Sequence, residues 1–217
     1  MLTMRKLQFS NGEYYHIYNR GVDHRSIVND EIDSDRFVDS MRLFNTVELK
    51  GGIYEISFRE DSKKLKFKDP LVDIIAYCLN PNHFHLCLCQ RRKNGISEFM
   101  KRLSGGYAYY FNKRHKRTGS LLEGRFKAKH LDDNNYLLHV SCYVSLNDKV
   151  HKLSYPVSNL VRSSWEENTT DLEGICSNKI IEGQYSKIEY KKFALSNLPY
   201  MLSKRGDYED LMNILHE

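Results

Sequence analysis

Two apolar segments joined by a proline turn constrain the fold of this 217-residue chain more than any other feature. Val72–Leu79 is a mostly apolar run of strand length, and Asn80-Pro81-Asn82 is a turn signal. His83–Gln90 then has the pattern of a returning strand. The sequence therefore predicts a β-hairpin over residues 72–90, and with it antiparallel strand pairing.

Further helix and strand signals surround this hairpin. They predict a strand over residues 14–21, a helix over 33–49, a strand over 53–58, a helix over 96–115 and a helix over about 135–147. A loop or hairpin tip is indicated by the charged residues Lys63, Lys64, Lys66 and Lys68. The sequence also predicts an ordered loop or short strand over residues 118–126, irregular structure over 163–178, and one or two small helices over 193–215. Helices mixed with antiparallel hairpins are typical of the α+β class.

The length and composition predict a soluble globular protein made of one domain with an appendage. Hydrophobic residues make up 41% of the chain and aromatic residues 12%. The apolar runs are too short to span a bilayer, and Met1–Lys6 lacks the apolar region of a secretory signal. We therefore expect a cytoplasmic protein that does not associate with membranes.

The cysteine pattern argues against disulfides. The five cysteines are Cys78, Cys87, Cys89, Cys142 and Cys176, and they form no C-x-x-C pair. An odd number of cysteines in a reducing compartment does not suit a disulfide framework. Zinc ligation by Cys87 and Cys89 is conceivable, but the alternation of this strand favours packing in the core.

His83-Phe84-His85 is the sharpest local motif. On a strand, residues i and i+2 project from the same face, so the two imidazoles converge while Phe84 points into the opposite, apolar layer. Such a pair can supply two nitrogen ligands to a divalent cation. H-x-H pairs also occur often by chance, so the motif alone does not decide between a metal site and ordinary packing.

A second motif lies on the helix predicted near residues 135–147. Tyr136, His139, Tyr143 and Asn147 are spaced to share one stripe of this helix. A tyrosine nucleophile suits phosphodiester transfer, because a phosphotyrosine ester conserves the bond energy for rejoining. The chain has 15 tyrosines, however, and most helical tyrosines simply pack.

Positive charge is concentrated in one segment. The chain has a net charge of +5, but the segment from Lys101 to His130 alone carries +8, so the remainder sums to −3. Aromatic residues such as Tyr107 and Phe126 lie among these basic residues, a combination that suits a single-stranded nucleic acid. A solvated basic helix face is the alternative interpretation.

Four segments, in order and at fitting spacings, resemble the REP-associated tyrosine transposases and their insertion-sequence relatives, the single-tyrosine HUH transposases. They are Cys78–Leu86 around the H-x-H motif, Tyr15–Gly21, Gly119–Lys127, and Tyr136–Leu138 followed by Tyr143–Asn147. The similarity extends from about Tyr14 to Asn147. It implies a ferredoxin-like antiparallel sheet with helices packed on it, the HUH motif on a central strand, and the catalytic tyrosine on a helix.

The resemblance also implies roles for particular residues. His83, His85 and Asn147 correspond to ligands of Mg²⁺ or Mn²⁺, and Tyr143 corresponds to the nucleophile that forms a 5′-phosphotyrosine. His139 and Lys127 are candidates for the group that deprotonates Tyr143. The implied partner is single-stranded DNA with a hairpin, and the basic residues expected to contact it are Lys113, Arg114, Lys116, Arg117, Arg125, Lys127 and Lys129.

We predict an HUH transposase domain over residues 1–152 and an irregular and helical extension over 153–217, in a monomer or homodimer. Two departures from the family fall after the catalytic helix: Asp148 replaces a common proline, and Val157–Leu160 replaces an expected tryptophan–serine pair. They affect a region expected to serve DNA recognition or docking of the extension. Two rival functions are a domesticated hairpin-binding protein that does not cut, and a phosphodiesterase that uses water.

Overall fold

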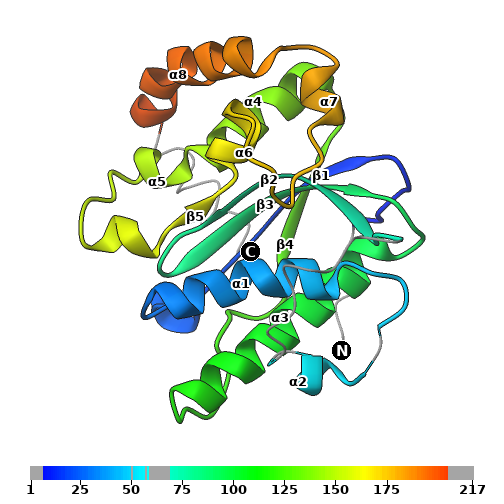
Figure 1. Ribbon diagram of the computed structural model, residues 1–217, viewed down its shortest axis with the longest axis vertical. Coiled ribbons are helices and arrows are strands. Elements are labelled where there is room, and N and C mark those ends of the chain that lie inside the picture. The colour runs from blue at the N-terminus through cyan, green and yellow to red at the C-terminus, as the bar shows by residue number, and fades with distance from the viewer. Residues whose placement is uncertain (1–6, 50, 57, 59–68, 205–217) are drawn as a thin grey trace.

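The computed structural model describes residues 7–49, 51–56, 58 and 69–204. Its centre is an antiparallel sheet with the strand order β4-β1-β3-β2-β5 and helices on both faces (Figure 1). The strands are β1 (Tyr14–Arg20), β2 (Val72–Leu79), β3 (His83–Gln90), β4 (Lys127–Leu131) and β5 (Arg162–Ser163). The predicted α+β class is confirmed, and the strand that carries the H-x-H motif is the central one.

The helices form a layer on each side of the sheet (Figure 1). α1 (Glu31–Phe44) and α3 (Gly95–Arg114) pack on the face to which Phe84 contributes. α4 (Asn134–Ser145) and α8 (Lys187–Ser203) close a second core on the other face, which contains Cys87 and Cys89. Both cysteines are buried free thiols, as core packing predicts. The shorter helices are η1 (Val22–His24), α2 (Ile53–Ile56), α5 (Asn147–Val150), η3 (Val157–Leu160), α6 (Trp165–Thr169) and α7 (Lys179–Glu182).

The β2–β3 hairpin has the predicted bounds. The backbone N–H of Asn80 donates to the carbonyl oxygen of His83 at 2.8 Å, which leaves Pro81 and Asn82 as the two loop residues. Proline suits this position because its missing N–H is not needed for strand pairing. The carbonyl of Pro81 accepts the N–H of Ile27 at 2.7 Å, so the turn is also fixed to the segment before α1.

Helix α1 ends earlier than the predicted residue 49. The side chain of Asn45 donates to the carbonyl of Val72 at 2.9 Å and accepts the Val72 N–H at 3.0 Å. This buried pair satisfies the backbone at the start of β2. It fixes the chain after Phe44, where the helix stops.

The predicted strand over residues 53–58 is wrong, because residues 53–56 form the short helix α2. Ile53 and Ile56 are three residues apart, and both pack in a small core with Phe44 of α1. That spacing puts both side chains on one side of a helical turn. The predicted loop around Lys63–Lys68 lies outside the described residues.

The structure of the C-terminal part differs from the prediction. The segment expected to be irregular contains α6, and β5 at its start pairs with β2. α8 begins at Lys187 rather than near 193, because Ser186 and Glu189 form a reciprocal capping box. Residues 205–217 of the last predicted helix lie outside the described part. None of the helices in the described residues is long and apolar enough to cross a membrane.

Candidate active site

The H-x-H motif, the end of α4 and the start of α5 meet on one face of the sheet. The rings of His83 and His85 are 5.2 Å apart between centroids, and the ring of Tyr143 lies edge-on to His85 at 5.7 Å. Asn147, which is fully buried, places its Oδ1 3.1 Å from His83 Nε2. The structure therefore brings together His83, His85, Tyr143 and Asn147.

The helix predicted to run through residue 147 breaks one residue earlier. α4 is capped at its start by the Asp133 side chain, which accepts the Tyr136 N–H, and it ends at Ser145. Leu146 leaves the helical conformation, and Asn147 opens the short helix α5. Because of this break, the Asn147 amide lies beside His83 at the end of the central strand.

His83 presents a lone pair toward Asn147. Its Nδ1 lies 2.7 Å from Asn82 Oδ1, and an amide oxygen only accepts hydrogen bonds, so Nδ1 carries the hydrogen. The lone pair of the neutral ring is then on Nε2, the atom that faces Asn147 Oδ1. A second amide, that of Asn80, lies 2.9 Å from the same Nε2.

His85 is held from β1. Its Nδ1 lies 2.9 Å from Nε2 of His16, which is partly buried and stacked against it. Burial, together with the charge of Lys129, lowers the pKa of His16 to about 4, and burial with the nearby imidazoles holds the pKa of His85 well below its usual value. Both rings are therefore neutral at neutral pH and retain lone pairs for a ligand or a hydrogen bond.

The donor atoms at this site fit a divalent cation that accepts amide oxygens. Within the described residues, no three His, Cys, Asp or Glu side chains are grouped so as to hold a metal ion, so amide ligands would have to contribute. Neighbouring ligands of an octahedral cation with bonds of about 2.1 Å are roughly 3 Å apart. The 3.1 Å between His83 Nε2 and Asn147 Oδ1 matches that spacing. The buried Asn147 Nδ2 has no hydrogen-bond partner, so the amide is held by its oxygen.

A second tyrosine also lies at this site. Tyr18 of β1 is buried, and its ring is 5.9 Å from that of His85. Burial raises the pKa of Tyr18 to about 12, so its hydroxyl stays protonated and is a poor nucleophile. The sequence does not single out Tyr18, since it is one of several aromatic residues in the first strand.

The two candidates for deprotonating Tyr143 lie in different surroundings. His139 is exposed on α4, and its ring lies 5.0 Å from Phe193 of α8. Lys127 pairs with Tyr18 across β4 and β1, so it shares the face of the sheet that carries His85. Burial, followed by the charge of Arg20, lowers the pKa of Lys127. The structure thus places Lys127, rather than His139, on the sheet face that carries the site.

The predicted DNA-binding residues divide into two groups. Lys127 and Lys129 pair with Tyr18 and His16, so both lie on the face that carries the site, and Arg125 is exposed in the preceding loop. The second group, Lys113, Arg114, Lys116 and Arg117, lies at the end of α3 on the opposite face. Arg114 forms ion pairs with Asp30 and Asp33, which tie α3 to α1.

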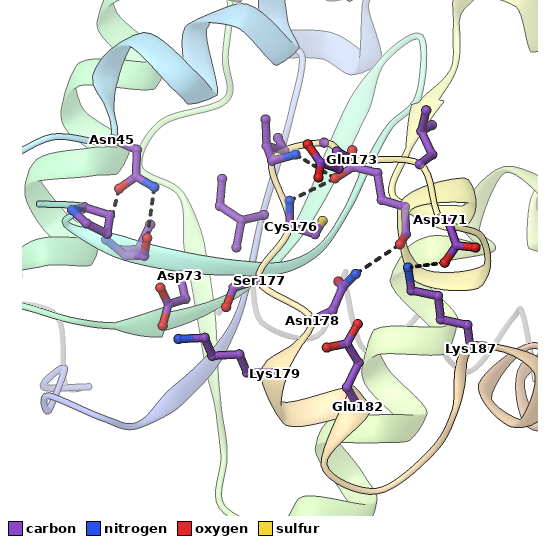
Figure 2. A pocket seen from close by; sticks show the side chains of 17 residues that line it. Asn45, Asp73, Asp171, Glu173, Cys176, Ser177, Asn178, Lys179, Glu182 and Lys187 are labelled. Carbon is purple, nitrogen blue, oxygen red and sulfur yellow. Dashed lines mark hydrogen bonds and ion pairs between the residues drawn. The ribbon is translucent and has the colours of Figure 1, made fainter. Parts of the chain in front are cut away.

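The described residues also line an acidic cavity of about 530 Å³ at the far end of β2 from Asn80 (Figure 2). Asp73, Asp171, Glu173 and Glu182 line it, with Lys179 and Lys187 as the basic residues among its lining. Lys187 is paired with Asp171 at 3.1 Å. This excess of carboxylates does not suit the phosphate backbone of a nucleic acid.

Residues 60–147 match the family of IS200-like transposases. The matched segment includes His83, His85, Tyr143 and Asn147. This segment is therefore similar to the IS200-like transposases. No curated protein matches the sequence at a significant level.

The likeness in fold extends beyond the matched segment. This chain is similar in fold to a solved structure, that of a REP-associated tyrosine transposase bound to a REP hairpin. The aligned region covers 86% of this chain and 90% of the transposase chain, with a TM-score of 0.50. The two sequences are 11% identical, so the comparison establishes a shared fold. The shared fold agrees with the antiparallel sheet and packed helices that the resemblance implies.

Four residues at this site are absent from the predicted set: His16, Tyr18, Asn80 and His151. His16 and Tyr18 lie in a segment that resembles the family's first strand, but their placement depends on the register between β1 and β3. The ring of His151, just after α5, lies 4.9 Å from that of His83. Only Asn80 had a local signal, since it directly precedes the proline turn.

Proposed function

We propose that this protein is a metal-dependent endonuclease and strand transferase that acts on single-stranded DNA through a 5′-phosphotyrosine. The observation that carries the proposal is the convergence of His83, His85, Tyr143 and Asn147 from β3, α4 and α5. Two imidazoles and an amide oxygen beside a tyrosine are the groups that this chemistry requires. The match of residues 60–147 to a transposase family supports the same function.

In this proposal His83, His85 and Asn147 would hold Mg²⁺ or Mn²⁺, which would supply a Lewis acid for the scissile phosphate. The Tyr143 oxygen attacks phosphorus and loses its proton. The bond from phosphorus to the 3′-oxygen breaks, and that oxygen leaves as a 3′-hydroxyl after gaining a proton. Attack by another 3′-hydroxyl reverses these steps, releases Tyr143 and completes strand transfer.

The proton of Tyr143 needs an acceptor, because a phenol ordinarily has a pKa near 10. We propose Lys127 for this role. Its lowered pKa makes the neutral amine more accessible than in an ordinary lysine, and its position in β4 shares the sheet face of the site. His139, packed beside Phe193 on the exposed side of α4, is the less suitable candidate.

The proposed substrate is single-stranded DNA with a hairpin. The solved transposase that shares the fold is bound to a REP hairpin, and the sheet face around Tyr18 and His16 carries Lys127 and Lys129. A monomer or a homodimer is compatible with this substrate. The two rival functions, binding without cleavage and hydrolysis by water, place no covalent bond between protein and DNA.

Denaturing electrophoresis tests the proposal directly. The substrate is a DNA hairpin with a randomised single-stranded flank, incubated with protein and Mg²⁺ or Mn²⁺. We expect a label on the 3′ end to migrate with the protein, while a label on the 5′ end appears on a shortened free strand. A hairpin-binding protein leaves both labels on intact DNA, and a hydrolase leaves both on free fragments, so either result contradicts the proposal.

Neutralising Lys127 and Lys129 with glutamine should weaken DNA binding and its dependence on salt. Each phosphate contact on a single strand contributes about 0.7 to the slope of log K against log salt, so two lost contacts should reduce it by about 1.4. The slope is measured by fluorescence anisotropy at several salt concentrations. The variant K113Q/K116Q/R117Q, at the end of α3, should change the slope less. Equal slopes for the wild type and the Lys127/Lys129 variant would remove these lysines from the interface.

Replacing His16 with alanine should weaken cation binding without preventing folding. The change removes the partner of His85 Nδ1, so the orientation of this buried ring is no longer fixed. Loss of a group that orients a metal ligand typically costs about 10- to 100-fold in metal affinity. Binding of Mn²⁺ is measured by the loss of its free EPR signal, with the exposed His139→Ala as control. An affinity equal to that of the control contradicts the role of His16.

A further inference from the structure

Asn80 lies beside two of the proposed cation ligands, although the family roles do not include it and its sequence signal is only that of a turn residue. It follows the last residue of β2 and is fully buried. Its backbone N–H donates to the His83 carbonyl, so the hairpin turn fixes its position relative to His83. The side-chain amide then reaches two of the proposed ligands, His83 and Asn147.

The three side chains form a compact triangle of atoms. Asn80 Nδ2 lies 2.9 Å from His83 Nε2 and 2.5 Å from Asn147 Oδ1, and these last two atoms are 3.1 Å apart. The Asn80 amide nitrogen donates to both neighbours, each of which accepts through the atom named. In this arrangement the amide bridges two acceptors that would otherwise repel each other.

The same triangle has the size of one face of an octahedral coordination shell. In an octahedron with bonds of about 2.1 Å, neighbouring ligand atoms are roughly 3 Å apart. Two edges of the triangle, 2.9 and 3.1 Å, match that spacing, and the third, 2.5 Å, is shorter. A cation bound above this face would need an oxygen, not a nitrogen, from Asn80.

A half-turn of the Asn80 amide supplies that oxygen. The oxygen and nitrogen of an amide are nearly equal in size, so the rotation exchanges their places without moving the backbone. At present Asn80 Oδ1 is 3.6 Å from the Cys78 thiol. A thiol is both a weak donor and a weak acceptor, so Cys78 can face either end of the amide.

We propose that Asn80 is a ligand of the divalent cation, and that its amide turns from bridging His83 and Asn147 to coordinating the ion through Oδ1. This inference rests on the proposed function, because it assumes that His83 and Asn147 bind a cation. A second amide oxygen also sets the metal preference. Oxygen ligands suit Mg²⁺ and Mn²⁺, whereas a site dominated by imidazole also suits zinc.

Binding of Mn²⁺ to the DNA-free protein, measured by EPR, tests the assignment. Asn80→Leu keeps the approximate size but removes the oxygen, and we expect about 10-fold weaker binding or more, on the scale of a lost site residue. Asn80→Asp supplies a charged oxygen, and we expect binding at least as tight as in the wild type. The exposed Asn159→Leu should bind as the wild type does. Circular dichroism checks that each variant is folded.

The outcomes separate this inference from the proposed function. If the wild type binds Mn²⁺ and Asn80→Leu binds it equally well, Asn80 is not a ligand and the proposed function stands. If the wild type binds no Mn²⁺, both fail. Should Asn80→Leu not fold, weaker binding by Asn80→Asp overturns the assignment. In a crystal soaked with Mn²⁺, we expect Asn80 Oδ1 at about 2.0–2.3 Å from the ion, and a clearly longer distance also refutes it.

Discussion

Replacing Tyr143 with phenylalanine is expected to abolish the covalent protein–DNA product and to lower cleavage by at least about 1000-fold, because the substitution removes the nucleophile itself. The ring that packs edge-on against His85 and His16 is retained. Only the hydroxyl is lost, so the free energy of unfolding should fall by about 1 kcal/mol or less. DNA affinity should remain close to that of the wild type. Cleavage and affinity are measured on the same labelled hairpin substrate.

Two further tyrosine variants serve as controls. Tyr18→Phe alters the other buried tyrosine at the site, and Tyr136→Phe alters the tyrosine two turns before Tyr143 on α4. Both should retain cleavage and the covalent product. If Tyr18→Phe loses the adduct while Tyr143→Phe keeps it, the nucleophile lies on β1 and the assignment of Tyr143 is wrong.

The sequence predicts the β2–β3 hairpin well because its signals are local. Strand length is set by an apolar run, and the turn is set by Pro81, whose conformation hardly depends on the rest of the chain. The same holds for α3, which begins and ends one residue from the predicted bounds. In these segments the local preferences and the tertiary packing agree.

The errors occur where tertiary contacts decide. Residues 53–58 alternate like a strand, but Ile53 and Ile56 pack as a helical turn against Phe44. The sequence predicts an ordered loop or short strand over residues 118–126 and nothing for 127–131, where β4 forms because the open edge of β1 pairs with it. Neither the helical turn at residues 53–56 nor the strand β4 can be predicted from a short window of sequence, because both depend on distant contacts.

The candidate site shows the same division. The resemblance to a transposase family indicated His83, His85, Tyr143 and Asn147, and the structure brings these four together. His16 could not be predicted, because its contact with His85 depends on strand register. The basic residues were selected by charge alone. Charge does not show that the lysines of β4 and the basic residues at the end of α3 lie on opposite faces of the sheet.

Removing divalent cations should stop cleavage completely. We expect no cleaved product and no covalent adduct in the presence of EDTA, and recovery of both when Mg²⁺ or Mn²⁺ is added in excess. His83→Ala and His85→Ala should each lower cleavage by at least about 100-fold, since a lost ligand weakens the ion that polarises the scissile phosphate. Single-turnover kinetics on the labelled hairpin measure these rates at a fixed cation concentration.

Thermal denaturation gives a second readout that does not depend on catalysis. A ligand present at 100 times its dissociation constant stabilises the folded state by about 2.7 kcal/mol, so Mn²⁺ should raise the melting temperature of the wild type. The increase should be small or absent in His83→Ala and His85→Ala, because these variants lack a ligand. His139→Ala, whose imidazole packs beside Phe193, should respond as the wild type does. Full cleavage in EDTA, together with no thermal response to Mn²⁺, would show that Tyr143 acts without a bound cation.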